Sequence, residues 1–407
     1  MAVIAESTVE TGVDDNLARR NAKILAIAQA LAGANNTVIV ATGAIVGSML
    51  APDKGLATLP ITAMVLGMWF GTVPVGILSK LIGRRAALQT GSVFGVLAGL
   101  VSCVAVIYGS FALLLLGTFS GGLYAAAHLA YRFAATDTAS EQFRPKAVSW
   151  VLAGGVLAGV IGPQLVIFTK DLWQPYLFAA TYIAQACVAL LAAFVLAFIR
   201  IPRPRKQENE AAARPLAQIA RTPAFIVAVI LGVVSYSMMN MVMTSAPLAM
   251  VGCGHSVSDA SLGIQWHVLA MYAPSFVTGT LITRYGAERI AGLGLVMLAA
   301  TGMVAISGLS VAHFWTALVL LGVGWNFSFI GATTMLAKTH LPSERNKVQS
   351  LNDFLIFGSM AVASFSSGKL LETIGWEAVN EMLFPATAIA GALLLWQVLR
   401  ARRQQAA

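Results

Sequence analysis

The sequence predicts an all-α, polytopic membrane protein whose twelve transmembrane helices form two pseudo-symmetric halves of six. Three observations support this prediction. First, 58% of the 407 residues are hydrophobic and only 11% are charged, whereas a soluble domain carries about 25% charged residues. Second, apolar runs of roughly 20 residues, the length that crosses a bilayer, recur along the chain. Third, a basic turn that begins at Gly76 has a counterpart at Gly279, half the chain later.

The apolar runs are interpreted as helices because a lone or open sheet leaves backbone groups without partners in lipid. The alternating segments of an outer-membrane barrel are also absent. We expect a disordered cytoplasmic tail at residues 1–22, a cytoplasmic linker at 200–222 and a second tail at 400–407. The helices expected in the halves 23–199 and 223–399 cover residues 23–49, 57–79, 87–108, 111–134, 147–169, 174–199, 223–249, 260–282, 289–310, 313–337, 350–368 and 380–399.

The distribution of lysine and arginine orients the chain. Basic residues collect on the cytoplasmic side of short loops. With both termini in the cytoplasm, all but three of the 26 basic residues fall on that side, the exceptions being Lys54, Lys170 and Lys369. The net charge of +9 is therefore an orientation signal in the inner (plasma) membrane. It predicts contact with acidic lipid headgroups and gives no support for nucleic-acid binding.

Two basic turns carry the internal repeat. The first runs from Gly76 to Gly83, has Lys80 between the glycines and is followed by Arg84 and Arg85. Glycines with the same separation and a basic residue between them recur in the second half. The second turn contains Gly279, Arg284, Gly286 and Arg289.

The expected helix at 111–134 has a polar face. Tyr124, His128, Tyr131 and Arg132 follow i, i+4, i+7, i+8 spacing and so share one side of the helix. Polar side chains on a membrane helix face protein or water. This face therefore indicates a path for a solute.

The expected helix at 147–169 carries small residues four apart. Gly155, Gly159 and Gly162 would let a neighbouring backbone approach closely. Pro163 follows them and offers an alternative interpretation, a kink that supports a gate. Close packing is the interpretation that the spacing favours.

With its helices and both basic turns in place, the chain resembles the major facilitator superfamily over nearly its whole length. The family's turn signature G-x-L-a-D-r-x-G-R-R is matched at Gly76, Leu78, Gly83, Arg84 and Arg85, but Lys80 stands where the family has aspartate. The resemblance implies a cavity between the halves that opens alternately to each side, lined by the first, fourth, seventh and tenth helices. The substrate-binding residues that it implies here are Asn36, Tyr124, His128, Tyr236, Asn240, Trp325 and Asn326.

The resemblance also implies contacts that gate the cytoplasmic side. In the family the turn's aspartate docks against the start of the eleventh helix. Here the turn has the basic Lys80 and the eleventh helix has the acidic Asp353, so the two charges are exchanged between the positions. This exchange predicts a contact between Lys80 and Asp353 across the two halves. The alternative role for Asp353 is to cap its helix. Within the halves, the family pattern predicts the pairs Arg84–Asp137 and Arg289–Glu344.

The energy source is left open by the sequence. Asp353 is the one acidic residue clearly inside an expected helix, and it lies near the cytoplasmic end. Protons remain a candidate coupling ion through His128 and His267, whose side chains titrate near neutrality when unperturbed. The drug–proton antiporters of the family that the chain resembles carry an arginine early in their fourth helix, and Gly117 stands at that position here. Ala158 stands where their fifth-helix motif has a glycine. A facilitator without a coupling ion fits equally.

The predicted function is transport of a small organic solute. No nucleotide-binding loop, metal-ligand set or nucleophile motif is present, so we expect no enzyme, cofactor or metal. Amide, aromatic and methionine side chains favour a neutral or anionic metabolite or vitamin with an aromatic or apolar body, and a flavin-like cargo would suit this lining. A monomer is expected. The alternatives are multidrug or metabolite efflux by proton antiport and a non-transporting receptor on the same scaffold.

Overall fold

The structure is a computed structural model that describes residues 14–201 and 214–406, and within these ranges its regular elements are all helical. In the first half they are α1 (Asp15–Leu50), η1 (Lys54–Leu56), α2 (Leu59–Leu81), α3 (Arg84–Tyr108), α4 (Phe111–Leu129), α5 (Tyr131–Ala134), α6 (Arg144–Thr169) and α7 (Ala179–Leu196). The second half contains α8 (Leu216–Ala220), α9 (Pro223–Gly252), α10 (Val257–Tyr272), α11 (Ser275–Tyr285), α12 (Ala287–Ile306), α13 (Val311–Ala337), η2 (Pro342–Glu344), α14 (Arg345–Thr373), α15 (Trp376–Glu381) and α16 (Leu383–Ala406).

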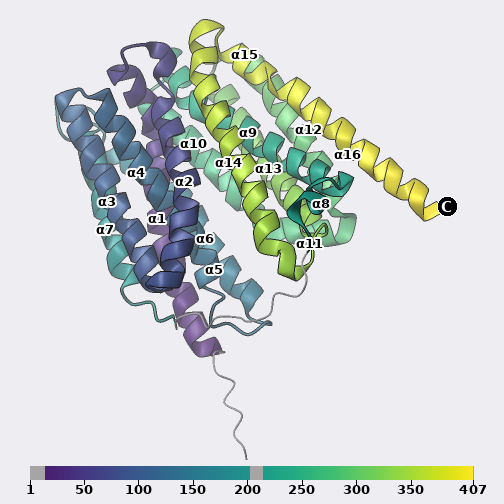
Figure 1. Cartoon of the computed structure of the whole chain (residues 1–407). Helices are drawn as coiled ribbons and strands as arrows, with labels where there is room; N and C mark the ends of the chain where they lie inside the picture. The colour runs from purple at the N-terminus through teal and green to yellow at the C-terminus, as the bar shows by residue number, and fades with distance from the viewer. Residues whose placement is uncertain (1–13, 202–213, 407) are drawn as a thin grey trace, which may run out of the picture.

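These helices form two groups, shown in Figure 1 as purple to teal and as green to yellow. In the first group α1 packs on α6, and α4 packs on both α2 and α3. In the second, α13 packs on α10 and α12, and α9 packs on α14. The groups meet where α6 contacts α10 and where α2 runs beside α14 (Figure 1). The predicted all-α fold with two halves is confirmed.

The expected helix at 260–282 is broken in the structure. Eleven helices within the described ranges are long and apolar enough to cross a membrane, and the twelfth crossing is made by α10 and α11 together. Pro274 separates them, because proline has no N–H to donate and its ring obstructs a continuous helix. The predicted number of twelve crossings therefore agrees with the structure once α10 and α11 are counted as one.

Residues 15–22 are helical, so the prediction of a disordered tail up to residue 22 was wrong for this segment. The Asp14 side chain accepts hydrogen bonds from the backbone N–H groups of Asn16 and Leu17 and thus caps α1. The Asn21 side chain bonds the carbonyl and N–H of Arg200. A hydropathy pattern does not detect such polar contacts, so it did not predict this helical segment.

The other two polar segments also contain helical residues. Helix α16 continues to Ala406 through the predicted tail at 400–407, and α8 lies within the predicted linker. The rest of that linker, residues 202–213, lies outside the described residues, as do residues 1–13.

Small residues allow helices to cross closely. A Cβ at Gly67 would lie 2.1 Å from the Phe119 carbonyl oxygen, and one at Gly122 would lie 2.0 Å from that of Met64. Helices α2 and α4 can therefore be this close only with glycine at both positions.

Helix α6 uses its glycines as the spacing predicted. A Cβ at Gly162 would meet Thr37 of α1 at 2.7 Å, and one at Gly159 would meet Val268 of α10 at 2.7 Å. The ring of Tyr272 lies over Gly155, at 3.5 Å from the position of such a Cβ. Pro163 lies inside the same continuous helix. Gly155 and Gly159 thus face the other half, whereas Gly162 packs within its own half.

Asn326 stabilises the break between α10 and α11. Its Nδ2 donates to the Met271 carbonyl at 2.6 Å and to Ser275 Oγ at 2.7 Å, and its Oδ1 accepts from the Thr278 hydroxyl at 2.6 Å. The carbonyls of a last helical turn lack helical donors, and Asn326 supplies one from α13. This fully buried amide therefore supports the broken crossing.

The two basic turns have the same backbone. Gly83 has φ 91° and ψ 156°, and Gly286 has φ 91° and ψ 149°. A side chain is disfavoured at such a positive φ, which is why a glycine closes each turn. The internal repeat thus extends from the sequence to the backbone angles.

The halves are joined at mid-depth and on the outer side. Thr58 donates to the Ser364 carbonyl at 2.9 Å, and Gln164 donates to Gln265 at 2.9 Å. The Trp69 ring of α2 contacts the Phe354 ring of α14 with centroids 4.9 Å apart. One turn further toward the cytoplasm on the same face of α2, Val73 is 66% exposed. The contact with α14 therefore reaches Trp69, and Val73 on the same face of α2 is uncovered.

We predict that Asn326→Ala lowers the free energy of unfolding by about 1–2 kcal/mol, because it leaves buried backbone and hydroxyl groups without partners. The measurement is reversible denaturation of the purified protein in mixed micelles. Ser328→Ala is the matched control, since the Ser328 hydroxyl is equally buried but bonds only carbonyls of its own helix. Equal losses in the two variants would contradict the role of Asn326 at the helix break.

Candidate functional site

Three aromatic side chains gather where the two halves meet. The Trp325 and Phe329 rings of α13 are stacked at 5.1 Å and 13°, and the Tyr236 ring of α9 stands edge-on to both, at 5.1 and 4.9 Å. We call these three residues the aromatic cluster. Tyr236 and Phe329 pack against a cluster of buried apolar side chains that joins Val65 of α2 to residues of α14, such as Ile356. The aromatic cluster therefore belongs to the interface between the halves.

Charged and phenolic groups face this region from other elements. Arg132 of α5 is exposed and interacts electrostatically with Tyr236, with Tyr272 and with Asp353. Tyr272 reaches the same region from α10, where it packs on α6. Asp353 of α14 is exposed and accepts a hydrogen bond from Asn352 at 3.2 Å. A cation and a carboxylate from opposite halves thus adjoin the aromatic residues.

Several buried polar atoms of the described residues lack hydrogen-bond partners, among them the hydroxyls of Tyr124 and Ser237. Two further examples are Oδ1 of Asn36 on α1 and Nε1 of Trp325 on α13. Helix α1 contacts α9 and α10 of the other half. A buried polar atom without a partner is costly, and its presence at an interface is explained when a ligand supplies the partner. Asn36 offers an acceptor and Trp325 offers a donor.

The polar face predicted on the fourth helix lies inside the first half. Tyr124 is 1% exposed, and its ring lies within 2.6 Å of where a Cβ at Gly95 of α3 would be. His128 is buried, and its Nδ1 lies 3.4 Å from Nε2 of Gln29 on α1. The expectation that these two side chains line the cavity is therefore replaced by packing within the bundle. The next turn, with Arg132, is the part that reaches the interface.

Two other expected residues bond within the second half. Asn240 donates to the Met360 carbonyl at 3.2 Å and so ties α9 to α14. His267 bonds the Leu318 carbonyl through Nδ1 at 2.8 Å, which ties α10 to α13. Together with Asn326, these residues make hydrogen bonds between helices of the second half. Of the seven predicted binding residues, Asn36, Tyr236 and Trp325 remain candidates, and their role in binding stays a prediction.

The cytoplasmic turn of the first half contains the predicted ion pair. Arg84 donates from Nε and NH2 to the two carboxylate oxygens of Asp137, at 2.8 and 2.9 Å. Both side chains are about a quarter exposed. The pair therefore fixes the relative position of its two segments more than it contributes to the free energy of folding. It ties the start of α3 to the segment after α5, and its role in gating stays a prediction.

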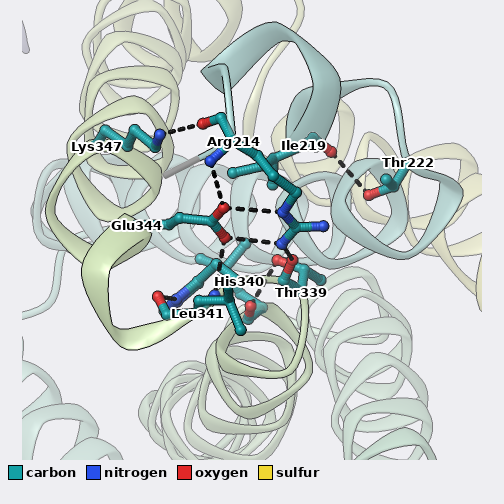
Figure 2. Close-up of polar contacts among 9 residues, drawn as sticks. Arg214, Ile219, Thr222, Thr339, His340, Leu341, Glu344 and Lys347 are labelled. Carbon is teal, nitrogen blue, oxygen red and sulfur yellow. Dashed lines mark hydrogen bonds and ion pairs between the residues drawn. The ribbon is translucent and has the colours of Figure 1, made fainter. Parts of the chain in front are cut away.

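The pair predicted for the second half was wrong. Glu344 binds Arg214, at the end of the linker, and Arg289 is exposed elsewhere. Figure 2 shows Glu344 accepting from Nε, NH2 and the backbone N–H of Arg214 and from the backbone N–H of Leu341, at 2.7–2.9 Å. Lys347 adds a hydrogen bond to the Arg214 carbonyl (Figure 2). Spacing along the chain could not reveal this pair, because Arg214 arrives from the linker.

The predicted contact between Lys80 and Asp353 remains a prediction, because the Lys80 side chain lies outside the described residues. The alternative, that Asp353 caps its helix, is wrong. Helix α14 begins at Arg345, so Asp353 lies about two turns inside it. Gly76 and Gly279, which open the two turns, have no other heavy atom within 4 Å of a built Cβ. The residues Arg85 and Arg284 of these turns are exposed or partly exposed.

Sequence reasoning missed parts of the interface. Phe329 was not singled out, although its i+4 relation to Trp325 is a signal that could have found it. Arg132 was identified only as a member of the polar face on the fourth helix. Which face of each helix turns toward the other half is decided by packing, and the sequence alone did not supply it.

Comparisons with known proteins agree with this architecture. The sequence model described as Major Facilitator Superfamily matches residues 25–338 and 228–407. The riboflavin transporter RfnT of Brucella anthropi is 47% identical over 396 residues, which cover 97% of this chain and 99% of the relative. The uncharacterized MFS-type transporter YdeG of Bacillus subtilis is 31% identical over 373 residues, covering 88% and 86%. A solved structure of a mutant nucleoside transporter NupG is similar with a TM-score of 0.70 at 14% identity, covering 93% and 99%, and shows the fold alone.

We predict that Glu344→Gln lowers the thermal midpoint at neutral pH. Hydrogen bonds from Arg214 hold the pKa of the Glu344 carboxyl far below its usual range. A lowered folded-state pKa contributes stability that is present above the unfolded pKa of about 4.3 and is lost as the pH falls toward the folded value. The midpoint difference between parent and variant should therefore be constant near neutrality and shrink below about pH 4.

The matched control is Glu377→Gln, a carboxyl in the first turn of α15 for which neither a hydrogen bond nor an ion pair is found in the described part of the chain. Its midpoint should follow that of the parent across the same pH range. A Glu344→Gln midpoint that also follows the parent would contradict the stabilising role of the Arg214 contact.

Proposed function

Because the chain belongs to the major facilitator superfamily and is a multi-pass membrane transporter of a small organic solute, we propose that its cargo is riboflavin. The 47% identity to a riboflavin transporter over 97% of this chain supports the proposal. The observation that carries it in the structure is the aromatic cluster at the interface between the halves.

The shape of the cargo suits the aromatic cluster. Riboflavin has a flat, uncharged three-ring isoalloxazine, and such a ring gains most from offset or edge-on contacts with other aromatic rings. Trp325 and Phe329 already form a stacked pair, and Tyr236 presents its edge to them. In the proposed complex the isoalloxazine packs against this set, with Tyr272 as a further aromatic neighbour.

The unpaired polar atoms suit the edge of the same ring system. The pyrimidine edge of isoalloxazine has one N–H donor between two carbonyl acceptors. Asn36 Oδ1 is a buried acceptor without a partner, and Trp325 Nε1 is a buried donor without one. In the proposal these atoms bind that edge, which would satisfy groups that are otherwise costly to bury. Arg132 and Asp353 then adjoin the hydroxylated ribityl chain.

The conformation supports transport by alternating access. Contacts between the halves are found on the outer side and at mid-depth, while Val73 of α2 is exposed. This is the arrangement expected of a carrier that faces the cytoplasm. We further propose that the protein works as a monomer in the inner membrane with both termini in the cytoplasm, on the basis of its basic cytoplasmic loops.

We predict that Trp325→Phe weakens riboflavin binding roughly 2- to 12-fold, because it removes the Nε1–H donor and a net hydrogen bond contributes about 0.5–1.5 kcal/mol. The measurement is titration of the purified protein with riboflavin, followed by quenching of the flavin fluorescence. Trp266→Phe is the matched control, because Trp266 lies on α10 and is 43% exposed on another face. An unchanged affinity in Trp325→Phe would exclude the proposed hydrogen bond from Trp325 Nε1 to the cargo.

A second measurement separates a carrier from a receptor. Proteoliposomes loaded with unlabelled riboflavin should accumulate external labelled riboflavin by exchange, and this exchange requires neither a known direction nor a known coupling ion. Binding without exchange would identify a non-transporting receptor. Absence of both for riboflavin, with binding of another aromatic metabolite, would overturn the proposed cargo and leave the transporter class unchanged.

A further inference from the structure

A groove on the outer flank of the second half is separate from the interface between the halves. It lies between α12 and α16 and has a volume of about 870 Å³. No member of the aromatic cluster lines it. Helix α16 runs along the edge of the molecule to the C-terminus in Figure 1. The walls are apolar and include Leu295, Val296, Phe384, Leu394, Leu395 and Val398.

The cytoplasmic end of the groove is basic. Arg289 lies in the first turn of α12 and Arg402 near the end of α16, and both line the groove and are exposed. Neither makes an ion pair with any residue of 14–201 or 214–406. The carboxylate at this end, Glu288, has Lys338 at 3.9 Å. The mouth therefore carries two guanidinium groups that lack a carboxylate partner.

The dimensions fit one leaflet of a bilayer. At 1.5 Å per residue, the ten steps from Arg289 to Ala299 on α12 span about 15 Å, which is half of the roughly 30 Å hydrocarbon core. Both residues line the groove. Its basic end is thus at headgroup level on the cytoplasmic side, and its apolar walls are at the depth of acyl chains.

The chain itself leaves room between the helices. No heavy atom lies within 4 Å of the position that a Cβ would take at Gly391 of α16, and at Gly292 of α12 the nearest is Leu394 Cδ2 at 3.6 Å. Both glycines line the groove. An acyl chain can pack against such a surface without moving either helix.

We propose that this groove binds an anionic phospholipid of the cytoplasmic leaflet, with its phosphate between Arg289 and Arg402 and an acyl chain along Gly292 and Gly391. Guanidinium groups bind phosphate with paired hydrogen bonds, and basic pockets between membrane helices on the cytoplasmic side are suited to acidic headgroups. The charge of the mouth favours a lipid over a second copy of this basic protein, whose surface near the same leaflet carries like charge.

The test compares lipid retention by the purified full-length protein in detergent. After exchange into micelles containing equal amounts of phosphatidylglycerol and phosphatidylcholine, bound lipid is counted by native mass spectrometry. The parent should retain phosphatidylglycerol preferentially. The double variant Arg289→Gln/Arg402→Gln, which alters the mouth, and Gly391→Leu, which fills the wall, should each retain at least threefold less.

Two matched controls accompany these variants. Arg403→Gln removes a neighbouring exposed charge that does not line the groove. Gly252→Leu adds the same side chain at the end of α9, where a built Cβ likewise has no heavy atom within 4 Å. Both controls should retain lipid like the parent. The thermal midpoint should rise with added phosphatidylglycerol in the parent and the controls, since a ligand of the folded state stabilises it.

Several outcomes would overturn the proposal. Equal retention of the two lipids would show an apolar surface without a headgroup site. Unchanged retention in both groove variants would place the lipid elsewhere. An equal rise of the thermal midpoint with inorganic phosphate alone would show a free-anion site. A concentration-dependent dimer that Gly391→Leu abolishes would make a second copy the occupant.

Discussion

The contact between the two halves is confined to the outer side and the middle of their interface, and the rest of the molecule is built around this restriction. Where the halves meet, the joining groups include hydroxyl and amide side chains such as Thr58 and Gln164, and the rings of Trp69 and Phe354. Within each half, polar groups are bonded across helices and glycines bring backbones close together. Two rigid bodies joined by a limited interface can change their relative tilt without losing their own packing.

That restriction also explains the position of the aromatic cluster. A ring surface buried deep within one half would be inaccessible, and one on the lipid face would lack contacts from the other half. Tyr236 and Phe329 pack on a cluster formed by residues of both halves, and Trp325 contacts both of these rings. A flat cargo bound there can exchange contacts between the halves as they tilt. Polar atoms without partners are tolerated at this place, because a bound solute can supply the missing bonds.

Much of the fold was predictable, and much of the site was not. The apolar runs, the repeated turn and the positions of the basic residues predicted two halves of six crossings, and the glycines of α6 predicted close packing. Within the candidate site, Asn36, Tyr236 and Trp325 were identified from depth and residue type. Tyr124, His128, Asn240 and Asn326 have the same signals but bond or pack inside a half. Phe329 looked like ordinary apolar filling.

The sequence by itself determined the class of protein, its repeat and its orientation, because bilayer thickness, backbone hydrogen bonding and the location of positive charge act on each segment separately. Only the tertiary structure decided which partner each polar side chain takes. Arg214 rather than Arg289 reaches Glu344, because the linker brings it there, and Asn326 binds the break that Pro274 makes in another helix. Such pairings depend on how helices far apart in the chain rotate and cross, and that is settled by packing all of them together.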